Sequence, residues 1–202
     1  MATDPIFDEK IMKPGILFIQ GGGEGAHESD KELADYLQHA LGKTHKISYP
    51  KVPNENNPDY EIFKNKIEEE IENVNDPIIL VGHSLGACYL LKYLTDIKIR
   101  KNISGLFLIA TPFWGKHGWQ YEGFTLNNEL ASRKTADIPT FFYHSTNDET
   151  VPFSHLGLYE EKFPHAKTRR IVGRGHQLDN DLSEVVHDIQ AVSRTVAKTQ
   201  HT

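Results

Sequence analysis

Cysteine is nearly absent from the sequence, and long apolar runs are absent altogether. Cys88 is the only cysteine among 202 residues, so an intrachain disulfide and a zinc ribbon are both excluded. The longest apolar runs, such as GLFLIA at 105–110, are far too short to span a bilayer. The first ten residues, MATDPIFDEK, are polar and acidic, unlike a secretory signal peptide. We therefore expect a soluble, cytoplasmic protein.

An excess of basic residues is also missing. The chain carries 28 acidic and 22 basic residues, for a formal net charge of −6. A nucleic-acid binder needs a basic surface that releases counterions from the phosphates. The charge balance therefore argues against a nucleic acid or an anionic membrane as partner. The length fits one domain with a substantial core.

The sequence does contain a repeated alternation of short apolar runs and longer amphipathic stretches. The runs are GILFIQ (15–20), HKISY (45–49), PIILVG (77–82), ISGLFLIA (103–110), IPTFFYH (138–144) and KTRRIVG (167–173). Most of them are continuous, as expected for strands that are covered on both faces. Strands that alternate with helices predict a mostly parallel sheet. We predict a single α/β domain, a three-layer α/β/α sandwich with about six strands.

Two of the predicted helices have recognisable ends, and a third is marked by its apolar face. Ser29 opens the tetrapeptide S-D-K-E, a capping box that closes on Glu32, and Gly42 supplies the C-terminal stop. The second helix is predicted to have Asn57 as its N-cap and Pro58 at its first position. The last helix is predicted from an apolar stripe made of Leu178, Leu182, Val185, Val186, Ile189 and Val192.

The sharpest chemical signal is the pentapeptide GHSLG at 82–86. It follows the strand PIILVG directly and precedes the helical pattern ACYLLKYLTDI, which is the strand–turn–helix setting of a nucleophile elbow. In such an elbow the hydroxyl of Ser84 projects above the sheet, and Gly82 and Gly86 avoid collisions with neighbouring elements. The N–H of Leu85 then points toward a developing oxyanion. The alternative interpretation is a tightly packed turn that needs two glycines.

A serine nucleophile needs a base and an orienting acid, and both follow later strands. Asp148 lies in STNDETVP after the strand IPTFFYH, and His176 lies in GRGHQLD after the strand KTRRIVG. The carboxyl ends of parallel strands share one edge of a sheet, so the three side chains should meet there. Glu149 and Asp137 are rival acids.

Other residues near these motifs have simpler interpretations. Among eleven histidines, His83 is interpreted as a flank of the elbow and His144 as a strand end. Cys88 is interpreted as a core residue. Pro152 is placed in the first turn of a further helix.

GHSLG after a strand, then D-E-T-V-P, then G-x-G-H, resemble the α/β-hydrolase fold, near its compact single-domain members. The resemblance covers nearly the whole chain from Gly15. It implies Ser84 as nucleophile, His176 as base, Asp148 as orienting acid, and no metal or cofactor. The sequence departs from the family pattern twice. Fourteen residues before the first strand leave no room for the usual N-terminal hairpin, and Gln20-Gly21 replaces the common His-Gly of the oxyanion loop.

The glycine-rich stretch FIQGGGEGAHESD at 18–30 admits two interpretations. Gly21, Gly23 and Ala26 match the dinucleotide fingerprint G-x-G-x-x-G/A. That fingerprint also requires an acidic residue at the end of the second strand, but the strand ends in SYP and the next acid is Glu55. We therefore interpret the stretch as an oxyanion loop, with Gly22 or Gly23 supplying the second N–H.

Residues 111–137 form an aromatic-rich excursion in the place where this fold often inserts a lid. Aromatic and apolar side chains are concentrated there: Phe113, Trp114, Trp119, Tyr121, Phe124 and Leu126. These side chains either line a modest acyl pocket, Phe113 and Trp114 foremost, or simply cover the end of the core.

The residues together predict a serine hydrolase that cleaves an ester or related acyl bond through an acyl-enzyme. Its partner would be a small-molecule acyl substrate. Esters, thioesters and amides are not separated by these motifs. Two other functions remain open, a non-catalytic binding protein on the same fold and a dinucleotide-dependent oxidoreductase.

Overall fold

The computed structural model describes residues 14–98, 100–120 and 124–199. One parallel sheet runs through the molecule in the strand order β2-β1-β3-β4-β5-β6. Its strands are β1 (Gly15–Ile19), β2 (Ile47–Ser48), β3 (Ile78–His83), β4 (Ile103–Ile109), β5 (Thr140–Ser145) and β6 (Lys167–Ile171). Each of the six coincides with one of the predicted apolar runs, although β3 and β5 each extend one residue beyond it.

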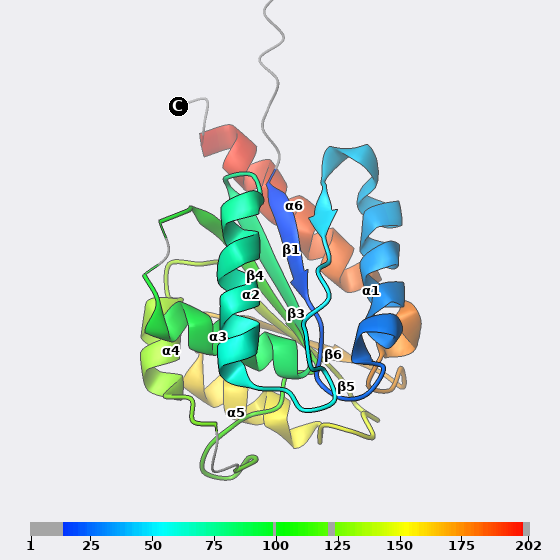
Figure 1. Cartoon of the computed structure of the whole chain (residues 1–202), viewed down its shortest axis with the longest axis vertical. Helices are drawn as coiled ribbons and strands as arrows, with labels where there is room; N and C mark the ends of the chain where they lie inside the picture. Colours follow the sequence, from blue (N-terminus) through cyan, green and yellow to red (C-terminus); the bar gives the residue numbers. More distant parts are fainter. Residues whose placement is uncertain (1–13, 99, 121–123, 200–202) are drawn as a thin grey trace, which may run out of the picture.

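Helices cover both faces of the sheet (Figure 1). They are α1 (Ala26–Leu41), α2 (Tyr60–Asn73), α3 (Leu85–Asp96), α4 (Asn128–Lys134), α5 (Ser154–Lys162) and α6 (Ser183–Thr199). Side chains of α1 and α6 pack on one face of the sheet, and those of α2, α3, α4 and α5 pack on the other. The three-layer α/β/α fold is therefore confirmed. In the described parts of the chain, no helix combines the length and apolar character needed to cross a membrane.

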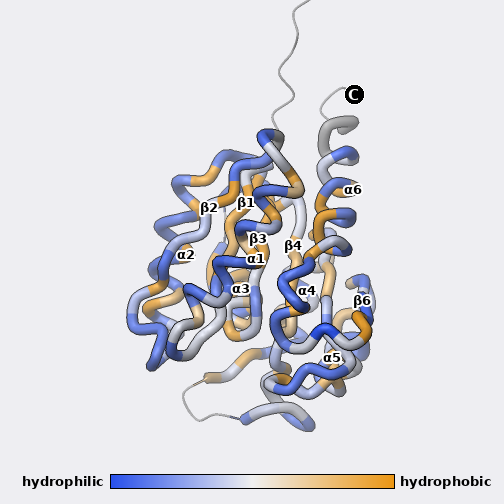
Figure 2. The backbone as a smooth tube through the Cα atoms, turned by 90° about the vertical axis from the view of Figure 1, so that its right-hand side faces the viewer, coloured by the Kyte–Doolittle hydropathy of each residue, from blue (hydrophilic) through white to orange (hydrophobic). Residues whose placement is uncertain are grey.

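The continuous apolar runs reflect burial on both faces of the strands. In β3, Ile78 and Leu80 point into the core on the α2–α3 side, and Ile79 and Val81 point into the core on the α1–α6 side. All four are fully buried. Successive side chains of a strand face opposite ways, so a strand inside three layers has no solvent face to mark with polar residues. Figure 2 shows these hydrophobic strands at the centre of the molecule.

Two predicted helix starts are wrong. Helix α1 begins at Ala26, after Gly25 in a left-handed conformation (φ 76°), so Ser29 lies inside the helix and caps nothing. Helix α2 begins after Asp59, whose carboxylate accepts the N–H groups of Glu61 and Ile62. Asn and Asp are comparable N-caps, so position decides: it is the side chain of Asp59 that reaches the free N–H groups of the first turn.

The C-terminal apolar stripe faces the core, with Val186 only partly buried, but it does not belong to one helix as predicted. Leu178 lies in a short 3-10 turn, η2 (Leu178–Asn180), with a positive φ of 50°, and Leu182 precedes α6. Both side chains still reach the same core. Pro152 likewise lies two residues before α5, and its carbonyl accepts the N–H of His155.

The structure adds a helix to the excursion at 111–137, and it leaves some of the residues discussed from the sequence undescribed. Helix α4 lies inside the excursion at 111–137, where no element was predicted. The polar N-terminus falls on residues 1–13, which lie outside the described residues, as does Tyr121.

Candidate active site

The carboxyl ends of all six strands lie along one edge of the sheet because every pairing is parallel. In Figure 1 this edge is the lower one, toward which the arrow of β1 points. Ser84 directly follows β3, Asp148 follows β5 by three residues, and His176 follows β6 by five. The fold therefore brings the three predicted residues to the same edge.

Ser84 occupies the sharp turn that the elbow motif predicts. Its φ of 50° and ψ of −121° lie outside the regions that a serine normally prefers. The turn is held because Ser84 donates its N–H to the carbonyl of Ile109, while its own carbonyl accepts the N–H of Ala87. Strand β3 thus delivers the serine to the top of the sheet, and α3 leaves immediately behind it.

The glycines of the motif are needed for close packing. A Cβ on Gly82 would lie 2.7 Å from the Cα of Ala87, and one on Gly86 would lie 2.6 Å from the carbonyl oxygen of Ile19. Real Cβ atoms essentially never come closer than 3.0 Å to a heavy atom beyond their own and the adjacent residues. Both positions therefore require glycine, for the reason predicted from the sequence.

Asp148 and His176 form a hydrogen-bonded pair. The Nδ1 atom of His176 lies 2.8 Å from Oδ2 of Asp148 and 3.0 Å from Oδ1. A carboxylate only accepts hydrogen bonds, so this contact assigns the proton of a neutral His176 ring to Nδ1. The Nε2 atom then carries the lone pair that a general base requires.

The Asp148 carboxylate is buried and ionised. Burial raises its pKa, but hydrogen bonds from His144, His176 and the N–H of Val151 outweigh burial and hold the pKa below the usual value. The His144 contact was not anticipated: its Nε2 lies 3.2 Å from Oδ2 of Asp148 and 2.9 Å from the carbonyl oxygen of Val151. His144 is thus more than the strand end that the sequence suggested.

The rival acids occupy other positions. Glu149 accepts the backbone N–H of His176 at 3.2 Å and leaves the imidazole to Asp148. Asp137 precedes β5 and therefore lies at the opposite edge of the sheet. Cys88 is fully buried in the core as predicted, and burial raises the pKa of its thiol.

The hydroxyl of Ser84 is not bonded to His176 in this structure. Within the described residues its Oγ has no hydrogen-bond partner. Catalytic hydrogen bonds are often long in the absence of substrate and tighten in the Michaelis complex. The hydrogen bond of the orienting pair is therefore formed, and a hydrogen bond between base and nucleophile is not.

The three backbone N–H groups of Gly21, Gly22 and Gly23 differ in their hydrogen bonds. Gly21 donates to Oδ2 of Asp30 at 2.7 Å, and Gly23 donates to the carbonyl of Glu55 at 2.7 Å. The N–H of Gly22 has no partner among the described residues, and neither has that of Leu85 at the start of α3. A Cβ on Gly22 would lie 2.6 Å from Cδ2 of Leu85, so the two residues are neighbours. Of the two candidate donors in the loop, Gly22 is the one that is free.

A cavity of about 390 Å³ opens at Ser84. It is lined by Gly22, Gly23, Asn57, Pro58, Ser84, Leu85, Tyr89, Pro112, Trp114, Trp119, Phe124 and Thr150. None of these residues carries a charge. Trp114 lines the cavity as predicted, but Phe113 does not, because its ring is buried against Tyr159 and belongs to the core.

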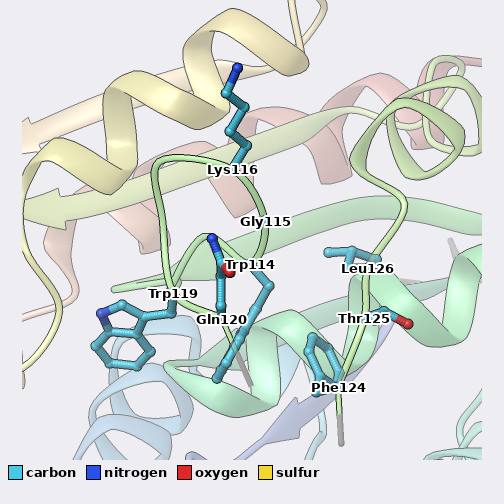
Figure 3. A pocket seen from close by; sticks show the side chains of 8 residues that line it. All are labelled: Trp114, Gly115, Lys116, Trp119, Gln120, Phe124, Thr125 and Leu126. Atoms are coloured by element: carbon cyan, nitrogen blue, oxygen red, sulfur yellow. The ribbon is translucent and has the colours of Figure 1, made fainter. Parts of the chain in front are cut away.

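A second cavity of about 600 Å³ adjoins the first. It shares Trp114, Trp119 and Phe124 with the cavity at Ser84, and Figure 3 shows these rings and Leu126 around it, with the side chain of Lys116 pointing away from both indoles. The aromatic residues of the excursion are therefore divided between the two predicted roles, lining a pocket and covering the end of the core. Some line a pocket, while Phe113, Phe124 and Leu126 also cover the core.

Hydrogen bonds from polar side chains join the loop after β5 to the loop after β6, and these residues were not predicted from the sequence. The side chain of Asn147 accepts the N–H of Gly175 at 2.9 Å, and the hydroxyl of Ser145 accepts that of Arg174 at 2.9 Å. Together with Glu149 they hold the loop that carries His176 by accepting its backbone N–H groups. Their only signal in the sequence is their nearness to Asp148.

Within residues 14–98, 100–120 and 124–199, no group of three His, Cys, Asp or Glu side chains is arranged to hold a metal ion.

Comparisons with known proteins bear on the family and the fold of the chain. The sequence matches the family model described as serine hydrolase over residues 25–181. No curated protein matches the chain. Solved structures with a similar fold include a YdeN-like protein of Pectobacterium atrosepticum, with 16% identity, a TM-score of 0.65, and coverage of 91% of this chain and 92% of that one.

Two further structures show the same likeness. SOBER1 of Arabidopsis thaliana is 16% identical, with a TM-score of 0.57 and coverage of 91% of this chain and 98% of that one. An esterase domain from Rhodothermus marinus is 12% identical, with a TM-score of 0.62 and coverage of 95% and 89%. At these identities the likeness concerns the fold.

Proposed function

The chain belongs to the serine hydrolase family, and from that premise we propose that it cleaves an ester or a related acyl bond through an acyl-enzyme. The proposed triad is Ser84, His176 and Asp148. The observation that carries the proposal is the 2.8 Å contact between Nδ1 of His176 and Oδ2 of Asp148, at the sheet edge where the elbow presents Ser84. This contact leaves Nε2 as the basic atom of the ring.

In the proposed reaction the Oγ of Ser84 attacks the acyl carbon, and its proton passes to Nε2 of His176. His176 then gives this proton to the departing alcohol. Water, which gives a proton to the same imidazole, attacks the acyl-Ser84 ester; the acid is released, and the imidazolium returns the proton to Oγ of Ser84. Asp148 stays ionised throughout and stabilises the imidazolium that forms in each half of the cycle.

The N–H groups of Leu85 and Gly22 are the proposed oxyanion donors. Both lack a partner among the described residues, and they belong to neighbouring residues. Donors that are already aimed at the developing charge need no reorganisation, and removal of one costs about 10²–10³ in rate.

The cavity supports an uncharged, largely apolar substrate of moderate size. Its lining holds four aromatic rings and no charged side chain, so a charged group beside the scissile bond would be desolvated without a counterion. One of the similar folds is that of an esterase domain, which favours an ester over an amide.

A fluorophosphonate probe tests the proposal directly. We expect the folded wild-type protein to be labelled at Ser84, as read from the modified peptide by mass spectrometry, and Ser84→Ala to remain unlabelled. Ser104→Ala is the matched control, since Ser104 is a buried serine near the start of β4, at the opposite edge of the sheet. That variant should label as the wild type does.

Absence of labelling in folded wild-type protein would overturn the triad and favour the binding-protein alternative. Hydrolysis of p-nitrophenyl acetate, butyrate and hexanoate then compares chain lengths in the aromatic cavity. Labelling without turnover of any ester would direct attention to thioesters and amides.

A further inference from the structure

A second aspartate–histidine pair lies beneath the site, and the reaction described above does not use it. Asp30 of α1 and His83 at the end of β3 are each about 1% exposed. The Nδ1 atom of His83 lies 2.9 Å from Oδ1 of Asp30. The contact does not meet the geometry of a regular hydrogen bond, and it is an ion pair when the ring of His83 is protonated.

The pair touches three loops that build the site. Oδ2 of Asp30 accepts the N–H of Gly21, one residue before the free N–H of Gly22. Oδ1 of Asp30 accepts the side-chain amide of Gln177 at 3.0 Å. Nε2 of His83 lies 3.1 Å from the carbonyl oxygen of His176. His83 itself is the residue before Ser84.

Counting donors and acceptors sets the protonation state of His83. Both ring nitrogens face oxygen atoms that only accept, the carboxylate of Asp30 and the carbonyl of His176. A neutral imidazole has one N–H, so one oxygen would face a lone pair at close range. An imidazolium presents a proton to each oxygen, as a hydrogen bond to the carbonyl of His176 and as a charge contact with Asp30, which neutralises it inside the protein.

The electrostatics agree with this assignment. Burial lowers the pKa of His83, but the charge of Asp30, the carbonyl of His176 and the more distant charge of Asp148 raise it above its usual value. Burial raises the pKa of Asp30, but the contacts with His83, Gly21 and Gln177 outweigh burial, so the pKa lies below its usual value.

We infer that Asp30 and the imidazolium of His83 form a positioning pair that aligns the oxyanion loop and the His176 loop with Ser84. The pair does not touch the substrate. It acts by fixing Gly21, which sets the direction of the next N–H, and by fixing the main chain of His176. A side chain at Gly21 would contact all three neighbours, Ser84, Asp30 and His83, so the oxyanion loop rests directly on this pair. The inference rests on the proposed function.

Nitrogen NMR on the intact protein tests the charge assignment without any activity. In ¹⁵N-histidine-labelled wild type, the resonances that disappear in His83→Gln belong to His83. We expect both ring nitrogens of His83 to be protonated at neutral pH. A bare nitrogen in His83 would overturn the assignment.

Kinetics test the positioning role through a double-mutant cycle of Asp30→Asn, His83→Gln and the variant with both changes. We expect each single change to lower kcat and the rate of fluorophosphonate labelling about 10- to 100-fold, below the loss for a direct oxyanion donor, with KM within about two-fold. Because the residues act as a unit, the double variant should be no slower than the slower single variant.

Asp188→Asn is the matched control. Asp188 is also a buried aspartate in an ion pair, with Arg169, but it lies on α6 away from the site. We expect its Tm to fall while kcat stays within two-fold of the wild type. Additive losses in the cycle, a kcat unchanged in Asp30→Asn, or equal losses of kcat in Asp188→Asn would each overturn the positioning role. Failure of the proposed function itself is seen separately, as wild type that does not label at Ser84.

Discussion

Replacing Gly86 by alanine tests how closely α3 packs on the end of β1. A Cβ at this position would lie 2.6 Å from the carbonyl oxygen of Ile19 and closer still to that of Gln20. Both obstacles are backbone atoms, and a methyl group has no rotamer that avoids them. To remove the overlap, α3 would have to move away from β1. Leu90 and Leu91 of α3 are fully buried in the core, so this movement would disturb their packing.

The expected cost follows from that overlap. Overpacking a core against side chains typically costs 1–3 kcal/mol, and a clash with two carbonyls should reach at least about 3 kcal/mol. For a chain of this size each kcal/mol lowers Tm by about 2–4 °C, so Gly86→Ala should melt roughly 6–12 °C below the wild type. Calorimetry and urea unfolding followed by circular dichroism measure the two quantities independently.

Gly157→Ala provides the opposite control. Gly157 lies inside α5, where a Cβ would have no atom within 4 Å. Alanine is favoured over glycine in a helix by about 0.5–1 kcal/mol, so this variant should be slightly more stable than the wild type. If the free energy of unfolding of Gly86→Ala lies within about 1 kcal/mol of the wild-type value, the close packing of the elbow against β1 is refuted.

Three other outcomes follow from the site and the core. Asp148→Asn should slow fluorophosphonate labelling about 10⁴-fold, because the amide no longer holds the required tautomer of His176; labelling near the wild-type rate would exclude Asp148 as the orienting acid. Contacts with Arg169 and Tyr143 outweigh burial and lower the pKa of Asp188, so they stabilise the fold above about pH 4 and less below it; melting curves from pH 6 to 2.5 should fall less steeply in Asp188→Asn. Trp119→Ala should lower kcat/KM for p-nitrophenyl hexanoate about 10-fold more than for the acetate, and equal losses would place the acyl chain elsewhere.

Much of the architecture was predictable because its signals are local. A strand covered on both faces is a continuous apolar run, and β3 and β4 show this in the sequence alone. The elbow is equally local, since Gly82, Ser84 and Gly86 lie within five residues between a strand and a helix. Helix starts are less secure: Ser29 had the right neighbours for a cap, but Gly25 had already begun the turn.

The order of Ser84, Asp148 and His176 along the chain also predicted their common edge, because parallel strands place their carboxyl ends together. Which acid faces the imidazole was open, with Glu149 next to Asp148. The structure separates them by their acceptors, the ring of His176 for Asp148 and its backbone N–H for Glu149.

The tertiary structure alone decided which groups of the site are free and which are engaged. Gly21, Gly22 and Gly23 are identical in the sequence, but only Gly22 keeps its N–H unpaired among the described residues, because Asp30 and Glu55 take the other two. The pairing of Asp30 with His83, 53 positions apart in the numbering, has no local signal either. Periodicity and turn chemistry act between neighbours in the chain, and so the sequence by itself determined the strands, the elbow and the edge. A buried hydrogen bond between distant residues exists only once the sheet has brought them together.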